Sequence, residues 1–154
     1  MSKELFDLIS TSPEQTEAIG ADLAKRMTID SNIPSFVAFY GDLGSGKTAF
    51  IRGFVSVVSP SSSVRSPTFT IVNEYRGGNI PVFHFDMYRI EDEDDLYSIG
   101  FYDYLPNGIC LCEWSENIEE SLPEEYVKLE ISRSLTPEES NVRHLKATII
   151  SNDL

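Results

Sequence analysis

The chain has 154 residues, and its 12 lysines and arginines against 25 aspartates and glutamates give a formal net charge of −13. This length suits one core, so we expect a single domain over residues 1–154, and the charge disfavours direct binding to a nucleic-acid backbone. No apolar run approaches the roughly 20 residues of a membrane span and the N-terminal residues do not resemble a secretory signal, so we expect a soluble, cytoplasmic protein.

A strand and an amphipathic helix are predicted first. Residues 3–9 form the predicted strand. Ser12, Pro13 and Gln15 then mark a helix start, with a side chain at the N-cap, a proline in the first turn and a capping-box partner. Apolar residues follow at helical spacing and predict one stripe on the core: Ile19, Leu23 and Met27.

A second strand and helix follow, separated by a glycine-rich turn. Residues 35–40 (SFVAFY) form a short, largely apolar run, which is typical of a strand covered on both faces. Residues 47–58 are predicted to form a helix whose apolar side chains face the core: Phe50, Ile51, Phe54 and Val58.

The middle of the chain predicts a hairpin. Residues 68–75 (TFTIVNEY) carry β-branched and aromatic side chains in near alternation, as in a strand. Residues 76–79 (RGGN) signal a turn, and residues 81–85 return as the paired strand.

The remaining segments predict one helix and three strands. Residues 92–105 are predicted to be helical, residues 109–112 to be a buried strand, and residues 127–133 and 144–150 to be two closing, antiparallel strands. Cys110 and Cys112 lie too close in one strand for an easy disulfide and lack metal-binding spacing, so we interpret them as buried thiols in a reducing cytoplasm.

The strongest motif is a phosphate-binding loop. It matches G-x-x-x-x-G-K-[ST] at every fixed position, with Gly41, Asp42, Leu43, Gly44, Ser45, Gly46, Lys47 and Thr48. Glycines let backbone N–H groups approach phosphate, and the following helix points its positive N-terminal end at the anion. Lys47 is expected at the β- and γ-phosphates and Thr48 on Mg²⁺, so we predict that the chain binds a nucleoside triphosphate with Mg²⁺. These segments together predict an α/β, P-loop NTPase-like three-layer sandwich with a mixed, mainly parallel sheet and C-terminal antiparallel strands.

Two acids are candidates for holding the metal or the attacking water. Asp86 and Glu113 each end an apolar strand, and the carboxyl ends of such strands open onto the ligand crevice. A capping or salt-bridged role is equally open for each. His84 shares a strand face with Asp86, and we interpret it as a structural histidine, with a catalytic role as the alternative. Trp114 either stacks on a ligand or lies at the edge of the core.

Two further segments leave alternatives open. A hydroxyl within Ser66–Pro67–Thr68 could sense the γ-phosphate, as mobile switch loops do. The acidic run 91–95 (EDEDD) is interpreted as a solvated helix start, with partner docking as the alternative.

In these residues the chain resembles the TsaE (YjeE) family, small bacterial ATPases of tRNA threonylcarbamoyladenosine synthesis. The resemblance covers residues 12–114 and rests on five segments in the right order and spacing: 41–48 (GDLGSGKT), 66–75 (SPTFTIVNEY), 84–89 (HFDMYR), 99–100 (IG) and 109–114 (ICLCEW).

The resemblance implies a set of site residues. Thr48 and Glu113 would hold Mg²⁺, and Asp86 would be the Walker B-like acid beside it. Thr68 would belong to a switch-like loop and Trp114 would lie beside the nucleotide. The ATP or ADP site would also take in Ala49, Ser12 and Pro13, and, near the base, a late residue that either Ser140 or Arg143 could supply.

The resemblance also implies partners. The chain would bind the threonylcarbamoyl-transferase subunit (TsaD-like) and its paralogous dimer partner (TsaB-like). Its ATP hydrolysis would keep the transferase cycling while it modifies the adenine next to the anticodon. The tRNA would then be held by the partners, which fits the net charge of −13.

Two other functions remain as alternatives from the residues. A small-molecule kinase on a P-loop scaffold is permitted by size and motif, although such kinases usually bring several arginines to the transferred phosphate, and the seven in this chain are dispersed. A regulatory GTPase is disfavoured, because the guanine-reading N-K-x-D pattern is absent from the sequence.

Overall fold

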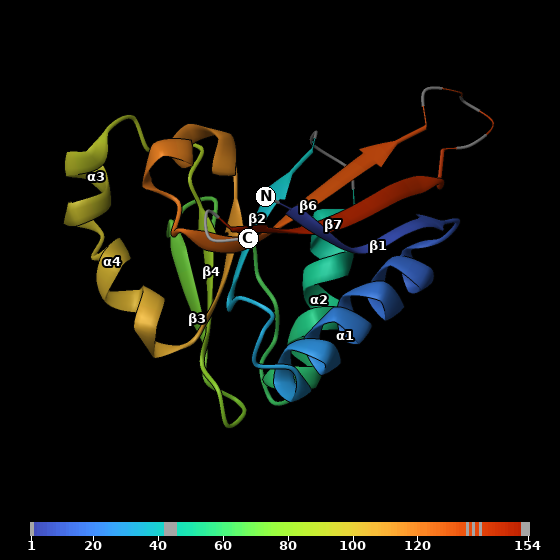
Figure 1. Ribbon diagram of the computed structural model, residues 1–154, viewed down its shortest axis with the longest axis horizontal. Helices are drawn as coiled ribbons and strands as arrows, with labels where there is room; N and C mark the ends of the chain where they lie inside the picture. Colours follow the sequence, from blue (N-terminus) through green and yellow to red (C-terminus); the bar gives the residue numbers. More distant parts are fainter. Residues whose placement is uncertain (1, 42–45, 135, 137, 139, 152–154) are drawn as a thin grey trace.

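The computed structural model describes residues 2–41, 46–134, 136, 138 and 140–151. The described residues form a seven-stranded sheet with the strand order β1-β7-β6-β2-β5-β4-β3, and helices cover both of its faces (Figure 1). The strands are β1 (Ser2–Ser10), β2 (Phe36–Tyr40), β3 (Val72–Tyr75), β4 (Val82–Asp86), β5 (Ile109–Glu113), β6 (Glu125–Arg133) and β7 (Arg143–Ser151).

Parallel strands make the centre of the sheet and antiparallel strands make its edges. β6, β2, β5 and β4 run parallel to one another. β3 joins β4 antiparallel, and β7 and β1 add antiparallel pairs beyond β6. The predicted α/β fold with a mixed sheet and C-terminal antiparallel strands is therefore confirmed.

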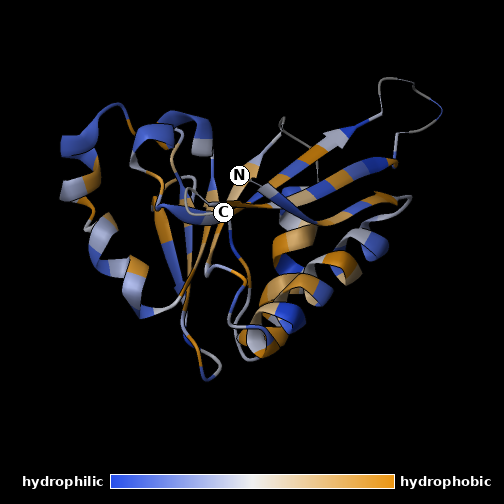
Figure 2. Cartoon of the chain, viewed as in Figure 1, coloured by the Kyte–Doolittle hydropathy of each residue, from blue (hydrophilic) through white to orange (hydrophobic). Residues whose placement is uncertain are grey.

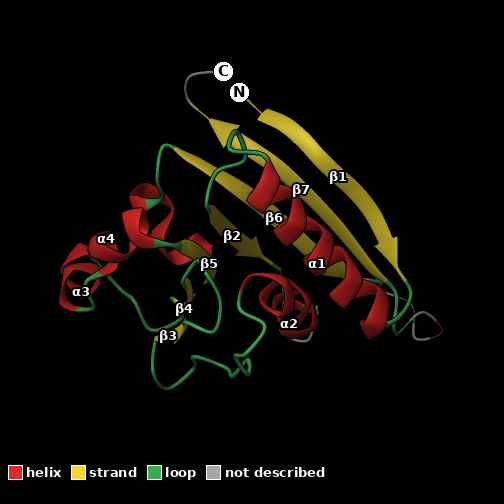
Figure 3. Ribbon diagram, turned by 90° about the horizontal axis from the view of Figure 1, so that it is seen from below, coloured by secondary structure: helices red, strands yellow, loops and turns green. Residues whose placement is uncertain are grey.

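Two helical layers lie on opposite faces of this sheet. The helices are α1 (Pro13–Ile29), α2 (Lys47–Val58), α3 (Glu93–Ser98) and α4 (Phe101–Tyr104), with 3₁₀ turns η1 (Leu105–Asn107) and η2 (Ser115–Ser121). α1 and α2 pack together on one face and α3 and α4 on the other (Figures 1 and 3). Among the described residues, no helix has both the length and the hydropathy needed to span a membrane.

Alternate side chains of the central strands pack into two separate hydrophobic cores, one on each face of the sheet. In β2, Val37 and Phe39 join the core beneath α1 and α2, whereas Phe36 and Ala38 join the core beneath α3 and α4. Hydrophobic and hydrophilic residues alternate along α1 (Figure 2), and the buried ones, such as Leu23 and Ala24, belong to the core beneath α1 and α2. The prediction that residues 35–40 form a strand covered on both faces is confirmed. Cys110 and Cys112 are free, buried thiols, as predicted.

α1 and α2 touch through their backbones. A β-carbon at Gly20 in α1 would lie 2.1 Å from the carbonyl oxygen of Phe50, and one at Gly53 in α2 would lie 1.9 Å from that of Glu17. Both distances are far shorter than van der Waals contact. The two glycines therefore set how closely α2, which starts at the predicted phosphate loop, approaches α1.

Three local predictions need correction. The predicted strand 68–75 is a strand only from Val72, because the N–H of Ile71 bonds the Pro67 carbonyl in a turn (2.8 Å). The predicted helix 92–105 is two short helices, because Gly100 turns left-handed with φ 73° between them. At the start of α1 the Ser12 side chain caps Gln15 as predicted, but the Gln15 side chain accepts from Thr11 rather than from Ser12.

A candidate nucleotide and metal site

The predicted phosphate loop joins β2 to α2 at the carboxyl edge of the parallel strands. Asp42, Leu43, Gly44 and Ser45 lie outside the described residues. Gly41 and Gly46 flank them with φ 146° and 105°, values that glycine adopts without strain. Gly46 is the N-cap of α2 and offers no side chain to the N–H groups of the first turn, which begins at Lys47. The N–H groups of Lys47, Thr48 and Ala49 thus form the positive end of the helix, the arrangement that binds anions elsewhere.

The start of α1 and the start of β7 meet beside this loop. A β-carbon at Gly46 would lie 3.7 Å from Cγ2 of Thr16 and 3.8 Å from Cγ of Arg143. Thr16 is buried and its hydroxyl bonds the Ser10 hydroxyl (2.8 Å). The predicted helix start at Ser12 and Pro13 therefore lies close to the loop.

Arg143, one of the two candidates for the late residue, lies beside Gly46. The guanidinium of Arg143 donates to the Ser140 carbonyl (2.6 Å), so Ser140 helps to hold it. Thr16 was not among the predicted residues. Its only sequence signal is its place four residues after the N-cap, in the first turn of α1.

Lys47 lies over the ring of Trp114. Its side-chain nitrogen is 5.4 Å from the ring centroid, and the residue is only 8% exposed. Trp114 directly follows β5 with φ 58°, a left-handed conformation rare for a bulky residue. The Tyr88 ring packs against the Trp114 ring, with 4.9 Å between the two centroids. The structure thus joins Trp114 to the predicted phosphate loop.

Asp86 and Glu113 lie side by side at the ends of parallel strands. They are register partners between β4 and β5. By strand alternation both face the α1 and α2 side, since their neighbours Phe85 and Cys112 belong to the opposite core. This is the face on which α2 begins, so the sheet brings both carboxylates toward Lys47.

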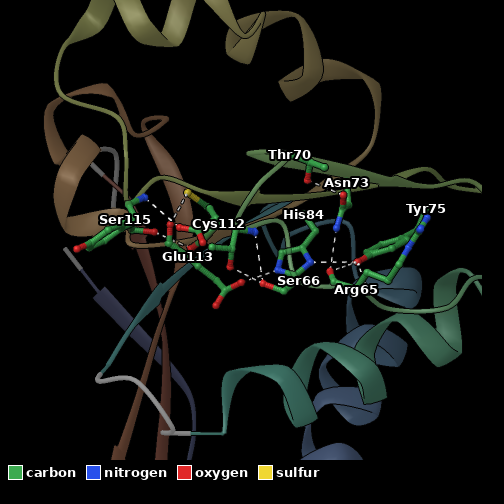
Figure 4. A network of polar contacts seen from close by, with 12 residues as sticks. Arg65, Ser66, Thr70, Asn73, Tyr75, His84, Cys112, Glu113 and Ser115 are labelled. Atoms are coloured by element: carbon green, nitrogen blue, oxygen red, sulfur yellow. Dashed lines mark hydrogen bonds and ion pairs between the residues drawn. The ribbon is translucent and has the colours of Figure 1, made fainter.

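The two carboxylates are held differently. Asp86 accepts a hydrogen bond from the backbone N–H of Tyr88 (3.0 Å). Glu113 Oε2 lies 2.7 Å from Nε2 of His84, whose side chain is almost fully buried. Figure 4 shows this contact within a larger polar network that reaches Tyr75 and Arg65. His84 is buried and hydrogen-bonded, and its partner is one of the candidate metal ligands.

The donor set suits Mg²⁺ bound together with phosphate. Among the described residues, no group of three or more His, Cys, Asp and Glu side chains comes together as a metal cage. Magnesium is commonly bound by one or two carboxylates with substrate phosphates and water. Two adjacent carboxylates and the exposed Thr48 in the first turn of α2 fit that pattern.

Hydrogen bonds hold the segment containing Thr68 beside the strand ends. The Thr68 hydroxyl bonds the Ser66 hydroxyl (2.6 Å), and the Thr68 carbonyl accepts from the Arg89 guanidinium. Ile71 ends the segment with φ 70°, and its carbonyl accepts from the Asp86 N–H (2.8 Å).

The acidic run 91–95 caps and begins α3, with Asp92 at its N-cap and side chains that are largely exposed, as predicted.

Comparison with known proteins gives one family. The model of the family described as "Threonylcarbamoyl adenosine biosynthesis protein TsaE" matches residues 10–142. A "tRNA threonylcarbamoyladenosine biosynthesis protein TsaE" from Bacillus subtilis is 39% identical over 125 residues, or 81% of this chain and 76% of that protein. Its namesake from Haemophilus influenzae is 44% identical over 85 residues, which is 54% of each chain.

A solved structure agrees with the sequence relatives. The crystal structure of YdiB from Bacillus subtilis superposes with a TM-score of 0.74 at 31% identity, covering 99% of this chain and 90% of that one. The segments that match the family include the candidate site residues from Ser12 to Trp114. By sequence and by fold, this chain belongs to the TsaE family.

Proposed function

We propose that this protein is a Mg²⁺-dependent ATPase subunit required for the threonylcarbamoyladenosine modification of tRNA. Its relatives are named for that biosynthesis. The observation that carries the nucleotide part is the convergence at one sheet edge: Lys47 at the start of α2 and the paired carboxylates Asp86 and Glu113 at the ends of β4 and β5. This is the arrangement of charges that phosphoryl transfer requires.

Each residue has a role that follows from its chemistry. The first-turn N–H groups of α2 bind phosphate oxygens, and the Lys47 ammonium balances the negative charge of the β- and γ-phosphates. Thr48, Asp86 and Glu113 hold Mg²⁺, which neutralises phosphate charge when bound. The backbone N–H groups and the Lys47 charge are needed because the protein as a whole, with a net charge of −13, repels a polyanion.

The nucleoside end of the ligand would extend toward α1 and β7. Thr16 and Arg143 flank Gly46 on that side, and α1 begins there, at Pro13. Arg143 can stack on a planar base as well as donate hydrogen bonds. The triphosphate would run from there across α2 toward Glu113 and Trp114.

The proposal includes partners and a place in the cell. The transferase subunit (TsaD-like) and its paralogue (TsaB-like) would bind this chain in the cytoplasm and hold the tRNA themselves. Such a division of labour suits a strongly acidic subunit, because acidic surfaces disfavour contact with nucleic acid.

Calorimetry tests the nucleotide part of this proposal. The purified protein should give a heat of association with ATP or ADP that depends on Mg²⁺, and it should hydrolyse ATP slowly alone. A well-folded protein that binds neither nucleotide would refute the proposal.

Reconstitution tests the pathway. The transferase subunit, its paralogue, tRNA and ATP should support repeated rounds of modification only when this protein is added. Unchanged modification in its absence would remove the proposed role even if nucleotide binding holds.

A further inference from the structure

His84 is a buried histidine with both ring nitrogens in hydrogen bonds. It lies on β4 and is 2% exposed. Nε2 is 2.7 Å from Oε2 of Glu113, and Nδ1 is 3.2 Å from the hydroxyl of Tyr75 on the neighbouring strand β3 (Figure 4). The Glu113 side chain is itself 19% exposed, at the open edge of the sheet. The ring therefore connects the protein interior to a carboxylate at the candidate site.

The imidazole ring of His84 holds the Glu113 carboxylate through its Nε2 nitrogen. An ionised carboxylate only accepts, so Nε2 must carry a hydrogen and donate it to Glu113. On the other side of the ring, Nδ1 lies within hydrogen-bond distance of the Tyr75 hydroxyl. The two contacts hold the ring from both sides, so His84 fixes the direction in which one Glu113 oxygen points, as outer-shell partners of metal ligands commonly do.

Tyr75 connects the His84–Glu113 contact to the segment that follows Arg65. Its hydroxyl accepts from the Arg65 N–H (3.1 Å) and donates to the Arg65 carbonyl (3.0 Å). The Asn73 amide also donates to that carbonyl (2.8 Å). The hydroxyl therefore sits between the backbone of Arg65 and the ring of His84. The segment that begins there contains Thr68.

We propose that His84 is a positioning residue that holds the carboxylate of Glu113 for Mg²⁺, and that Tyr75 acts through His84 by anchoring it to the backbone of Arg65. The inference rests on the proposed function, since it assigns His84 a task only if Glu113 binds the metal. It adds a residue that touches neither nucleotide nor metal but sets the metal affinity.

Four variants test the contacts from Tyr75 through His84 to Glu113 one at a time. His84→Phe keeps a flat ring and removes both hydrogen bonds. His84→Gln restores a donor toward Glu113. Tyr75→Phe removes only the hydroxyl that anchors the ring. Tyr102→Phe is the matched control, because it removes a tyrosine hydroxyl that donates to a different glutamate, Glu93 (2.6 Å), away from the site.

The measurement is the Mg²⁺ concentration that half-saturates the magnesium-dependent part of ADP binding, with ADP affinity in EDTA as a second readout. His84→Phe should raise that concentration by roughly 10–100-fold, the usual effect of losing an outer-shell partner. His84→Gln should recover most of the loss and Tyr75→Phe should show a smaller loss. ADP affinity in EDTA should stay unchanged in all variants, since the phosphate loop is intact, and Tyr102→Phe should match the wild type.

A double variant adds a test that a merely structural role would not pass. Once Glu113→Gln has removed the metal ligand, adding His84→Phe should cause no further loss of Mg²⁺ dependence, because both changes act on one interaction. Additive losses would overturn the proposal. So would a folded His84→Phe protein with wild-type Mg²⁺ dependence. If that variant does not fold, His84→Gln and Tyr75→Phe decide. The proposal is contradicted if both variants lose Mg²⁺ dependence fully and equally, or if both keep the Mg²⁺ dependence of the wild type.

The outcome also distinguishes this inference from the proposed function. A wild-type protein that binds no ADP with or without Mg²⁺ refutes the nucleotide site itself. A wild type with clear Mg²⁺-dependent binding, together with His84 and Tyr75 variants that retain it, refutes only the positioning role.

Discussion

Replacing Gly20 or Gly53 by alanine should push apart the two helices that support the candidate site. Each added methyl group would lie within 2.1 Å or 1.9 Å of a carbonyl oxygen in the facing helix, whereas ordinary contact begins near 3.4 Å. The obstacle is backbone on both sides, so no side chain can rotate away. The helices must separate by more than an ångström.

The magnitude follows from two opposing terms. Overpacking a close-packed interior costs up to about 3 kcal/mol, and alanine recovers about 1 kcal/mol over glycine in helix propensity. We therefore expect each variant to lose about 2 kcal/mol of unfolding free energy, which corresponds to a fall in Tm of roughly 4–8 °C for a chain of this size.

Thermal and urea unfolding followed by circular dichroism measure this loss. Ala18→Gly is the matched control, because Ala18 is an exposed residue of α1 where glycine should be the less stable residue by about 1 kcal/mol. The double alanine variant should lose less than the two single losses combined, since helices already separated accommodate the second methyl group.

A functional readout accompanies the stability measurement. α2 begins at Lys47, so a displaced α2 should weaken Mg²⁺–ATP binding in variants that still fold. Alanine variants at Gly20 and Gly53 that are as stable as the wild type would show that the helices do not meet as closely as described.

Three further predictions concern the site and the buried thiols. Lys47→Ala should weaken Mg²⁺–ATP binding by at least roughly 10–100-fold, the loss of a charged hydrogen bond, and calorimetry at near-native affinity would contradict it. Trp114 is the single tryptophan and lies 5.4 Å from the Lys47 nitrogen, so Mg²⁺–ADP should change the intrinsic fluorescence as the ammonium moves to phosphate, and Trp114→Phe should abolish the signal. Burial raises the pKa of the Cys110 thiol to about 12 and also raises that of Cys112. The unfolded thiols ionise first, so unfolding free energy should fall as pH rises from about 9 toward 12, by at most about 1.4 kcal/mol per pH unit per thiol. Urea melts of a Cys110→Ala, Cys112→Ala variant should show a shallower decline, and an equal slope would argue against protonated native thiols.

Much of the fold could be predicted because its signals are local. Residues 47–58 carry a helical apolar pattern that starts after a glycine-rich turn, and the observed helix has those bounds. Residues 36–40 are apolar on both faces because helices cover both sides of the strand. Prediction failed at residues 68–71, where strand-like residues form a turn whose end is held by the N–H of Asp86, far along the chain.

The sequence by itself determined the phosphate-binding motif, the alternation of strands and helices, and which acids end the strands, since each depends on neighbours along the chain. Tertiary structure alone decided the pairing of Asp86 with Glu113, the placement of Arg143 beside Gly46, and the contact of His84 with Glu113. These contacts depend on strand order and register. Both are set by packing between segments distant in sequence, which local periodicity does not record.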